Sequence, residues 1–257
     1  MLLGLGFAAG VLGGLLGIGG GVLIVPGLVF FLGFEQHRAQ GTSLAAALLL
    51  SVTGVLTYSS HGHVDLRLAI EIAAGGVIGA VVGARVVSRI RSRTLRRLFS
   101  LFIFALAVAM IANGRAIETA AVRPDAVGPL LGSLIAVGTG FVTGFISALL
   151  GIGGGVVMVP AMVVLLDVPQ HTAQGVSLAA IIPTALTAML MHAAMGNVEF
   201  RVGKWVGVGG AIGALIGATV AASLATHHLR VAFGIFLIVL ALLMALRKNS
   251  RAAAASP

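Results

Sequence analysis

Leu15-Leu16-Gly17-Ile18-Gly19-Gly20-Gly21-Val22, followed by Pro26, is a hydrophobic stretch interrupted by glycines, and it occurs twice. The second copy runs from Leu149 to Val156 and is followed by Pro160. Adding 134 to a position in the first copy gives its counterpart, and 20 of the 31 positions from 16 to 46 are identical without a gap. The same register continues to position 110, which pairs with 244. The chain therefore contains a duplicated unit of about 110 residues.

The composition is that of an integral membrane protein. Hydrophobic residues make up 59% of the chain, charged residues 9%, and the mean hydropathy is +1.13. Soluble domains carry about 25% charged residues. The apolar runs are continuous, whereas strands of a membrane barrel alternate apolar and polar residues. We therefore predict an all-α, polytopic transmembrane helical bundle. The chain has no cysteine, which excludes disulfides, thiolate catalysis and cysteine metal ligands.

The net charge of +9 does not indicate a nucleic-acid partner. The basic residues stand at the ends of apolar segments, where arginine and lysine anchor cytoplasmic loops. The expected surroundings are a lipid bilayer.

The apolar segments divide the chain into two units. The first unit, 1–113, has two arms at about 2–16 and 22–34 around the glycine break, then helices at about 40–60, 68–88 and 97–113. A linker, 114–128, leads to the second unit, 129–246, and a cytoplasmic tail, 247–257, follows.

The opening segment allows two topologies. Each arm of roughly 13–15 residues is about 20–22 Å long as a helix, short of the ~30 Å hydrocarbon core. The segment either crosses once as a broken helix, with parallel units, or folds back as a hairpin, with inverted units. The inverted arrangement places 12 of the 16 lysines and arginines inside, and the parallel one places 8. We therefore predict two inverted-topology repeats, each opening with a glycine-broken helical hairpin, with the basic loop 89–97 and the C-terminus in the cytoplasm.

The glycine runs at 19–21 and 153–155 are the first candidate site. Successive glycines permit a tight reversal, and the free N–H groups and positive dipole end of the following helix favour an anion. Inverted repeats with broken helices near the midplane are typical of secondary transporters. The alternative is that glycines serve helix packing, which fits the glycines spaced by four at Gly75, Gly79, Gly83, Gly209, Gly213 and Gly217.

A second element follows each break. Gln40-Gly41-Thr42-Ser43 and Gln174-Gly175-Val176-Ser177 are expected to open the next helix, with each serine capping it. Four helix N-termini, two from each unit, would then converge on one site.

The doubled Gly-Ile-Gly-Gly-Gly-x4-Pro, each followed by Gln-His-x-Ala-Gln-Gly-x-Ser-Leu-Ala-Ala, resembles the sulfite exporter TauE/SafE family over nearly the whole chain. The resemblance implies export of sulfite, sulfonates or related small sulfur-containing or carboxylate anions across the bacterial inner membrane. The duplicated unit with paired glycine breaks favours a transporter that works by alternating access over an enzyme. Few acidic residues fall within the apolar segments, so we expect no metal site, and we expect no cofactor. The motif carries over to Gly19, Gly20, Gly21, Pro26, Gln40, Gly41, Ser43, Gly153, Gly154, Gly155, Pro160, Gln174, Gly175 and Ser177. Thr42, opposite Val176, makes the two half-sites chemically unequal.

Four ionisable residues are candidates beside the motif. His192 lies inside an apolar run, where the first unit has Tyr58, and is a candidate for substrate contact or proton coupling. His37, His171 and Glu71 are weaker candidates for gating or proton coupling, because each also fits an interfacial position. The repeated acid-x-Arg sequence, Asp65/Arg67 and Glu199/Arg201, predicts a salt bridge within each loop.

Two rival functions stay open at this point. One is transport of a divalent metal or a neutral solute, and the other is an intramembrane hydrolase that uses a serine with His192. The coupling ion, H⁺ or Na⁺, and a homodimer also stay open.

Overall fold

The computed structural model describes residues 1–86, 101, 104–105, 107–108, 128–150 and 154–246. The elements that it defines there are helices, with no strand among the described residues. They are α1 (Leu2–Leu16), α2 (Gly21–Leu32), α3 (Gln36–Ser60), α4 (Leu66–Val86), α6 (Pro129–Leu150), α7 (Gly155–Leu165), α8 (Gln170–Ala194), α9 (Phe200–Ser223) and α10 (Thr226–Leu246). The linker, the basic loop 89–97, the tail and most of the helix expected at 97–113 lie outside the described residues.

The lengths of the helices fit a protein that crosses a membrane several times. Six of the described helices are long and apolar enough to span it: α3, α4, α6, α8, α9 and α10. The arms α1, α2 and α7 are short, as expected. The arm α6 begins at Pro129, where the second unit was expected to start, and its 22 residues exceed the roughly 13–15 expected for an arm. Proline is well suited to the first position of a helix.

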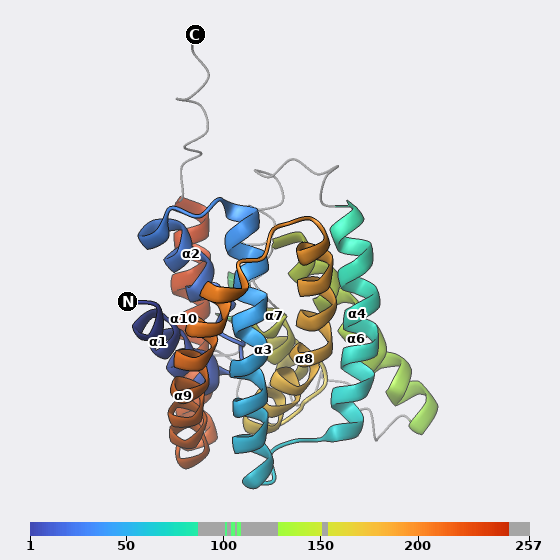
Figure 1. The fold of residues 1–257 in the computed structure, drawn as a ribbon. Coiled ribbons are helices and arrows are strands. Elements are labelled where there is room, and N and C mark those ends of the chain that lie inside the picture. The colour runs from blue at the N-terminus through green and yellow to red at the C-terminus, as the bar shows by residue number, and fades with distance from the viewer. Residues whose placement is uncertain (87–100, 102–103, 106, 109–127, 151–153, 247–257) are drawn as a thin grey trace.

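The helices form a row whose centre is the pair α3 and α8. α3 packs against α8 and α9, α8 packs against α4, α9 packs against α1, and α4 packs against α6 (Figure 1). Contacts at two glycines show how α3 and α8 are oriented relative to each other. A Cβ at Gly41, near the start of α3, would touch His192 near the end of α8, and one at Gly54 would touch Leu178. α3 and α8 therefore run antiparallel.

When two residues from different copies of the repeat are in contact, their two counterparts are also in contact. Gly10 on α1 lies against Gly210 on α9, and their counterparts Gly144 on α6 and Gly76 on α4 lie against each other. Gly41 lies against the carbonyl oxygen of Asn197, and its counterpart Gly175 lies against that of His63. Equivalent helices thus occupy equivalent places and α3 opposes α8, which is the relation that inverted units require.

The glycines spaced by four serve helix packing. A Cβ at Gly75 or Gly79 would meet carbonyl oxygens of α6, and one at Gly209, Gly213 or Gly217 would meet carbonyl oxygens of α1. Without side chains at these positions the backbones approach closely, which is how membrane helices gain packing contacts in lipid. The packing interpretation is confirmed for these five glycines.

The opening segment folds back as a hairpin. A Cβ at Gly20, before α2, would lie 3.2 Å from the carbonyl oxygen of Ala9 on α1. A Cβ at Gly27 would meet the side chain of Leu5, further back on α1. α2 therefore returns along α1 instead of continuing it.

The two ends of the bundle differ in charge. We call one the Arg38 end; it holds the start of α3 and the α8–α9 connection 195–199, with Arg201 and Lys204 just beyond. We call the other the His63 end; it holds the α3–α4 connection 61–65, the start of α8 and the α9–α10 connection. Arg38 forms an ion pair with Glu199, so these two segments meet at one end. This grouping fits the charge distribution expected for inverted units.

Candidate functional site

A cavity of about 130 Å³ lies between the two copies of the repeat. One water needs about 10–15 Å³, whereas pockets for drug-sized ligands start near 300 Å³, so the volume suits a small ion or solute. Its walls come from both glycine breaks and from α3, α4, α6 and α8. The lining residues are Ile18, Gly19, Gly21, Gln40, Ser43, Leu44, Ala47, Ala80, Val81, Gly144, Gly154, Met158, Ile181, Thr184, Ala185, Thr187, Ala188, Met191, His192 and Met195.

The first glycine break uses backbone conformations that suit glycine alone. Gly17, Gly19 and Gly20 have φ values of 71°, 69° and 71°, in the left-handed region that L side chains rarely adopt. Gly17 ends α1, and Gly20 is the N-cap of α2. The first N–H groups of α2 consequently begin at the cavity wall, where Gly21 lies, and such groups have no intrahelical acceptor.

The two breaks meet halfway along the central helices. A Cβ at Gly155, the first residue of α7, would lie 2.5 Å from Cα of Ile18. A Cβ at Gly19 would lie 3.1 Å from Ile181, the twelfth of the 25 residues of α8. Two helix N-termini, those of α2 and α7, are therefore brought together near mid-height of the bundle. Gly153 lies outside the described residues.

The capping expectation for Ser43 and Ser177 is wrong. α3 begins at Gln36 with Glu35 as N-cap, and α8 begins at Gln170 with Pro169 as N-cap, without a capping side chain in either. Each serine is therefore the eighth residue of its helix and lies in the third turn. The Ser43 hydroxyl donates to the carbonyl oxygen of Gln40, 2.8 Å away within the same helix. Two helix N-termini converge at the breaks, not four.

Polar side chains line the cavity between the breaks and the Arg38 end. Gln40, Ser43 and His192, all predicted for the site, lie here with Thr184 and Thr187. Both threonine hydroxyls donate to backbone carbonyl oxygens of α8, which leaves their oxygens as acceptors. Nδ1 of His192 is buried without a hydrogen-bond partner. Among the lining residues that the structure describes, His192 has the only titratable side chain.

The equivalent half of the site at the His63 end is closed. Gln174 and Ser177, the counterparts of Gln40 and Ser43, are fully buried and do not line the cavity. The Gln174 amide donates to the carbonyl oxygen of Leu15 at 3.0 Å. The Tyr58 hydroxyl lies 3.0 Å from the Gln174 side-chain oxygen and 3.0 Å from the carbonyl oxygen of Gly14. These hydrogen bonds connect α1, α3 and α8 between the cavity and the His63 end.

Several other predicted site residues lie away from the cavity. Gly41, Gly155 and Gly175 pack against neighbouring backbone. The Thr42 hydroxyl accepts the N–H of Glu199 at 3.0 Å and so ties α3 to the α8–α9 connection. Three more predicted site residues do not line the cavity: Gly20 is the N-cap of α2, Pro26 lies inside α2, and Pro160 lies inside α7.

The weaker candidates lie at the two ends of the bundle. His37 is exposed at the start of α3. His171 lies at the His63 end, where its Nε2 is 3.2 Å from the carbonyl oxygen of Ala221 and its ring stacks on His63 with centroids 4.8 Å apart. Burial first, and then the neighbouring His171 and His61, hold the pKa of His63 below its ordinary value.

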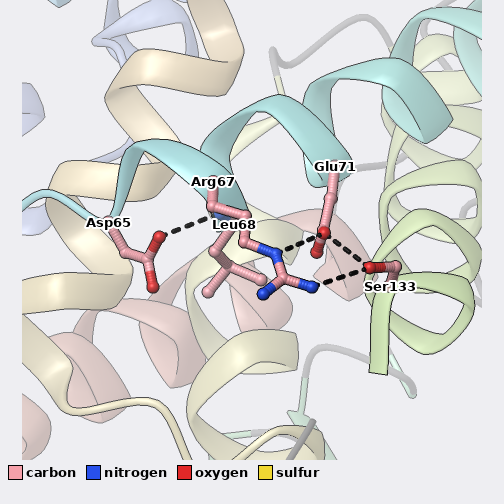
Figure 2. A network of polar contacts seen from close by, with 5 residues as sticks. All are labelled: Asp65, Arg67, Leu68, Glu71 and Ser133. Carbon is pink, nitrogen blue, oxygen red and sulfur yellow. Dashed lines mark hydrogen bonds and ion pairs between the residues drawn. The ribbon is translucent and has the colours of Figure 1, made fainter. Parts of the chain in front are cut away.

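Glu71 joins α4 to α6, away from the cavity. Figure 2 shows its carboxylate accepting from Arg67 at 3.1 Å and from Ser133 at 2.7 Å. Asp65 instead accepts the N–H of Leu68 at the start of α4. The salt bridge expected within each loop is therefore wrong: Arg67 pairs with Glu71, one helical turn on, and Glu199 pairs with Arg38.

Sequence reasoning missed most of the residues of α8 that line the cavity, and it missed the role of Tyr58. Ile181, Thr184, Ala188, Met191 and Met195 recur at spacings of three and four, so helical periodicity alone places them on one face. Tyr58 is the single tyrosine of the chain and lies in an apolar run. A buried tyrosine hydroxyl needs an acceptor, which was the available signal.

The profile of the family described as "Sulfite exporter TauE/SafE" matches residues 1–110 and 135–257. The chain belongs to this TauE/SafE family. It is 32% identical over 242 residues to a probable membrane transporter protein of Xylella fastidiosa (strain Temecula1), covering 92% of this chain and 89% of that one. It is 29% identical over 214 residues to the probable membrane transporter protein YunE of Bacillus subtilis (strain 168), covering 76% and 78%. No solved structure matches the chain. It is therefore a multi-pass membrane transporter of the TauE/SafE family.

Proposed function

We propose that this protein exports a small sulfur-containing or carboxylate anion, such as sulfite or a sulfonate, across the bacterial inner membrane by alternating access. The observation that carries the proposal is the cavity at the meeting point of the two glycine breaks, whose lining extends along α8 as far as Met195 at the Arg38 end, while Tyr58 and Gln174 are buried and hydrogen-bonded on the side of the His63 end. The family description supports the substrate class. We propose two inverted units, 1–113 and 129–246, with the Arg38 end in the cytoplasm, where basic residues gather.

The chemistry of the cavity favours an anion over a cation. The N-termini of α2 and α7 present free N–H groups and the positive ends of two helix dipoles. The Gln40 amide adds two N–H donors. Among the described lining residues there is no carboxylate to hold a divalent metal. Transport of a metal is therefore poorly supported by this cavity.

The geometry also weighs against a serine–histidine hydrolase. Ser43 is the serine that lines the cavity with His192, and its hydroxyl donates to the Gln40 carbonyl oxygen instead of to the imidazole. A nucleophilic serine needs its base within hydrogen-bond reach.

The test is flux of radiolabelled sulfite or a taurine-type sulfonate in proteoliposomes. Gln40→Leu removes the amide from the cavity, and Gln36→Leu removes an exposed amide one turn earlier on α3. We expect saturable flux from the wild type and Gln36→Leu, and at least about a tenfold loss for Gln40→Leu, since a hydrogen bond to a charged group is worth that ratio. Equal flux from both variants would refute the site, and no flux of either anion by the wild type would refute the substrate class.

A further inference from the structure

The pair Tyr58 and Gln174 and the pair His192 and Gln40 are counterparts under the repeat. Adding 134 to 58 gives 192, and subtracting 134 from 174 gives 40. The first pair lies between the glycine breaks and the His63 end, and the second between the breaks and the Arg38 end. Each pair contains one residue of α3 and one of α8. The two pairs are in opposite states in this structure.

The Tyr58 pair is closed. Both side chains have no exposed surface, and the hydroxyl lies 3.0 Å from the Gln174 oxygen. The Gln174 amide also donates to the carbonyl oxygen of Leu15 on α1, and the Tyr58 hydroxyl lies within hydrogen-bond distance of that of Gly14, the preceding residue. The bonds cross from α3 to α8 and from both to α1, so opening this end requires breaking them.

The His192 pair is open. Gln40 and His192 both line the cavity, and Nδ1 of His192 is buried without a partner. A Cβ at Gly41 would lie 2.9 Å from Cβ of His192, so α3 and α8 already touch here. An imidazole nitrogen that lacks a hydrogen accepts, and the Gln40 amide is a donor. The two groups are complementary but are not bonded.

We propose that Tyr58 and Gln174 form the gate at the His63 end, and that a Gln40–His192 hydrogen bond forms the equivalent gate when the His63 end opens. This inference rests on alternating access as the proposed function. Because the copies occupy equivalent places, exchanging their conformations opens the Tyr58 pair and closes the His192 pair. Ser177 then lines the cavity as Ser43 does here.

Thiol labelling tests the gate without knowledge of the substrate. The chain has no cysteine, so Ser43→Cys and Ser177→Cys each introduce a single thiol. Ser177→Cys breaks no hydrogen bond, because the Ser177 hydroxyl has no partner. Each is placed in the wild type and in Tyr58→Phe, which keeps the ring and removes the hydroxyl. Ser60→Ala is the control, since its hydroxyl bonds within α3 to Thr57. A membrane-impermeant maleimide is applied from each side.

In the Tyr58→Phe background we expect labelling at position 177 to rise about three- to tenfold from the His63 side, the ratio that the loss of one hydrogen bond gives. Labelling at position 43 from the other side should fall. Ser60→Ala should change neither rate. The reciprocal variant His192→Ala should lower labelling at 177 and leave position 43 reactive. The gate is refuted if position 177 reacts alike in Tyr58→Phe and Ser60→Ala, or, should Tyr58→Phe fail to fold, if His192→Ala leaves both rates unchanged.

The outcomes separate the gate from the substrate. If labelling shifts as expected but the protein transports neither sulfite nor sulfonate, the gate is supported and the proposed substrate is wrong. Anion flux that depends on Gln40, with labelling unmoved by Tyr58→Phe, keeps the substrate and overturns the gate.

Discussion

At the scale of single residues, His63 links pH to the closed end of the bundle. Because its pKa lies below the ordinary value of 6.5, the folded protein favours the neutral imidazole, which stacks on His171. The unfolded chain therefore takes up the proton first as the pH falls. The stability from this contact is complete above about pH 6.5 and decreases as the pH falls below it.

The corresponding variant is His63→Asn, which introduces the residue that the second copy carries at 197. We expect the thermal midpoint of the wild type in detergent to fall between about pH 7.5 and pH 5.5, and that of His63→Asn to fall less. His227→Asn is the control, because His227 lies beside His228 at the same end and does not stack on His171. A pH response of His63→Asn equal to that of the control would contradict the assignment.

The sequence predicted some of the residues that line the cavity. Gly19, Gly21, Gln40, Ser43, Gly154 and His192 were predicted for the site and line it. Gln174 and Ser177 belong to the same motif and are buried, because the two copies adopt different conformations. A repeat in sequence cannot show such a difference. The caps were misplaced because α3 and α8 each begin one turn before the motif.

At the scale of elements, bare glycine backbones define the packing of α1 on α9 and of α6 on α4. A Cβ at Gly10 would overlap the carbonyl oxygen of Gly210, whereas a Cβ at Gly4, on the same helix, would meet nothing within 4 Å. Overpacking of this kind costs about 1–3 kcal/mol. An alanine at an unhindered helical position gains up to about 1 kcal/mol over glycine.

We therefore expect Gly10→Ala to lower the thermal midpoint in detergent and Gly4→Ala to leave it unchanged or raise it. Gly144→Ala should match Gly10→Ala, because a Cβ there would overlap the carbonyl oxygen of Gly76. If Gly10→Ala were as stable as Gly4→Ala, the close approach of α1 and α9 would be wrong.

The sequence predicted the helices more accurately than it predicted which helices pack against each other. Apolar segments and glycine breaks indicated the helices, and the hairpin of α1 and α2 follows from the left-handed glycines. α6 begins at Pro129, where the second unit was expected to start, but it is longer than the roughly 13–15 residues expected for an arm. The exchange of partners, with α1 on α9 of the other copy, depends on long-range packing and has no signal within one copy.

At the scale of the whole molecule, one small cavity lies between two ends that are equivalent under the repeat, and only the pair toward the His63 end, Tyr58 and Gln174, is hydrogen-bonded. Exposed apolar side chains such as Phe30, Leu56 and Leu243 suit contact with lipid. We expect the transported anion to occupy the cavity at the glycine breaks.

The most direct measurement is protection of the Ser43→Cys thiol by the anion. Position 43 lines the cavity, whereas Ser60→Cys, at the far end of α3, places a thiol outside it. We predict that a sulfonate, which unlike sulfite does not itself add to maleimide, slows maleimide labelling at position 43, half-maximally at the concentration that half-saturates sulfonate flux. Labelling at position 60 should not respond. Labelling at position 43 that is unaffected by saturating anion, in protein that transports it, would contradict the account.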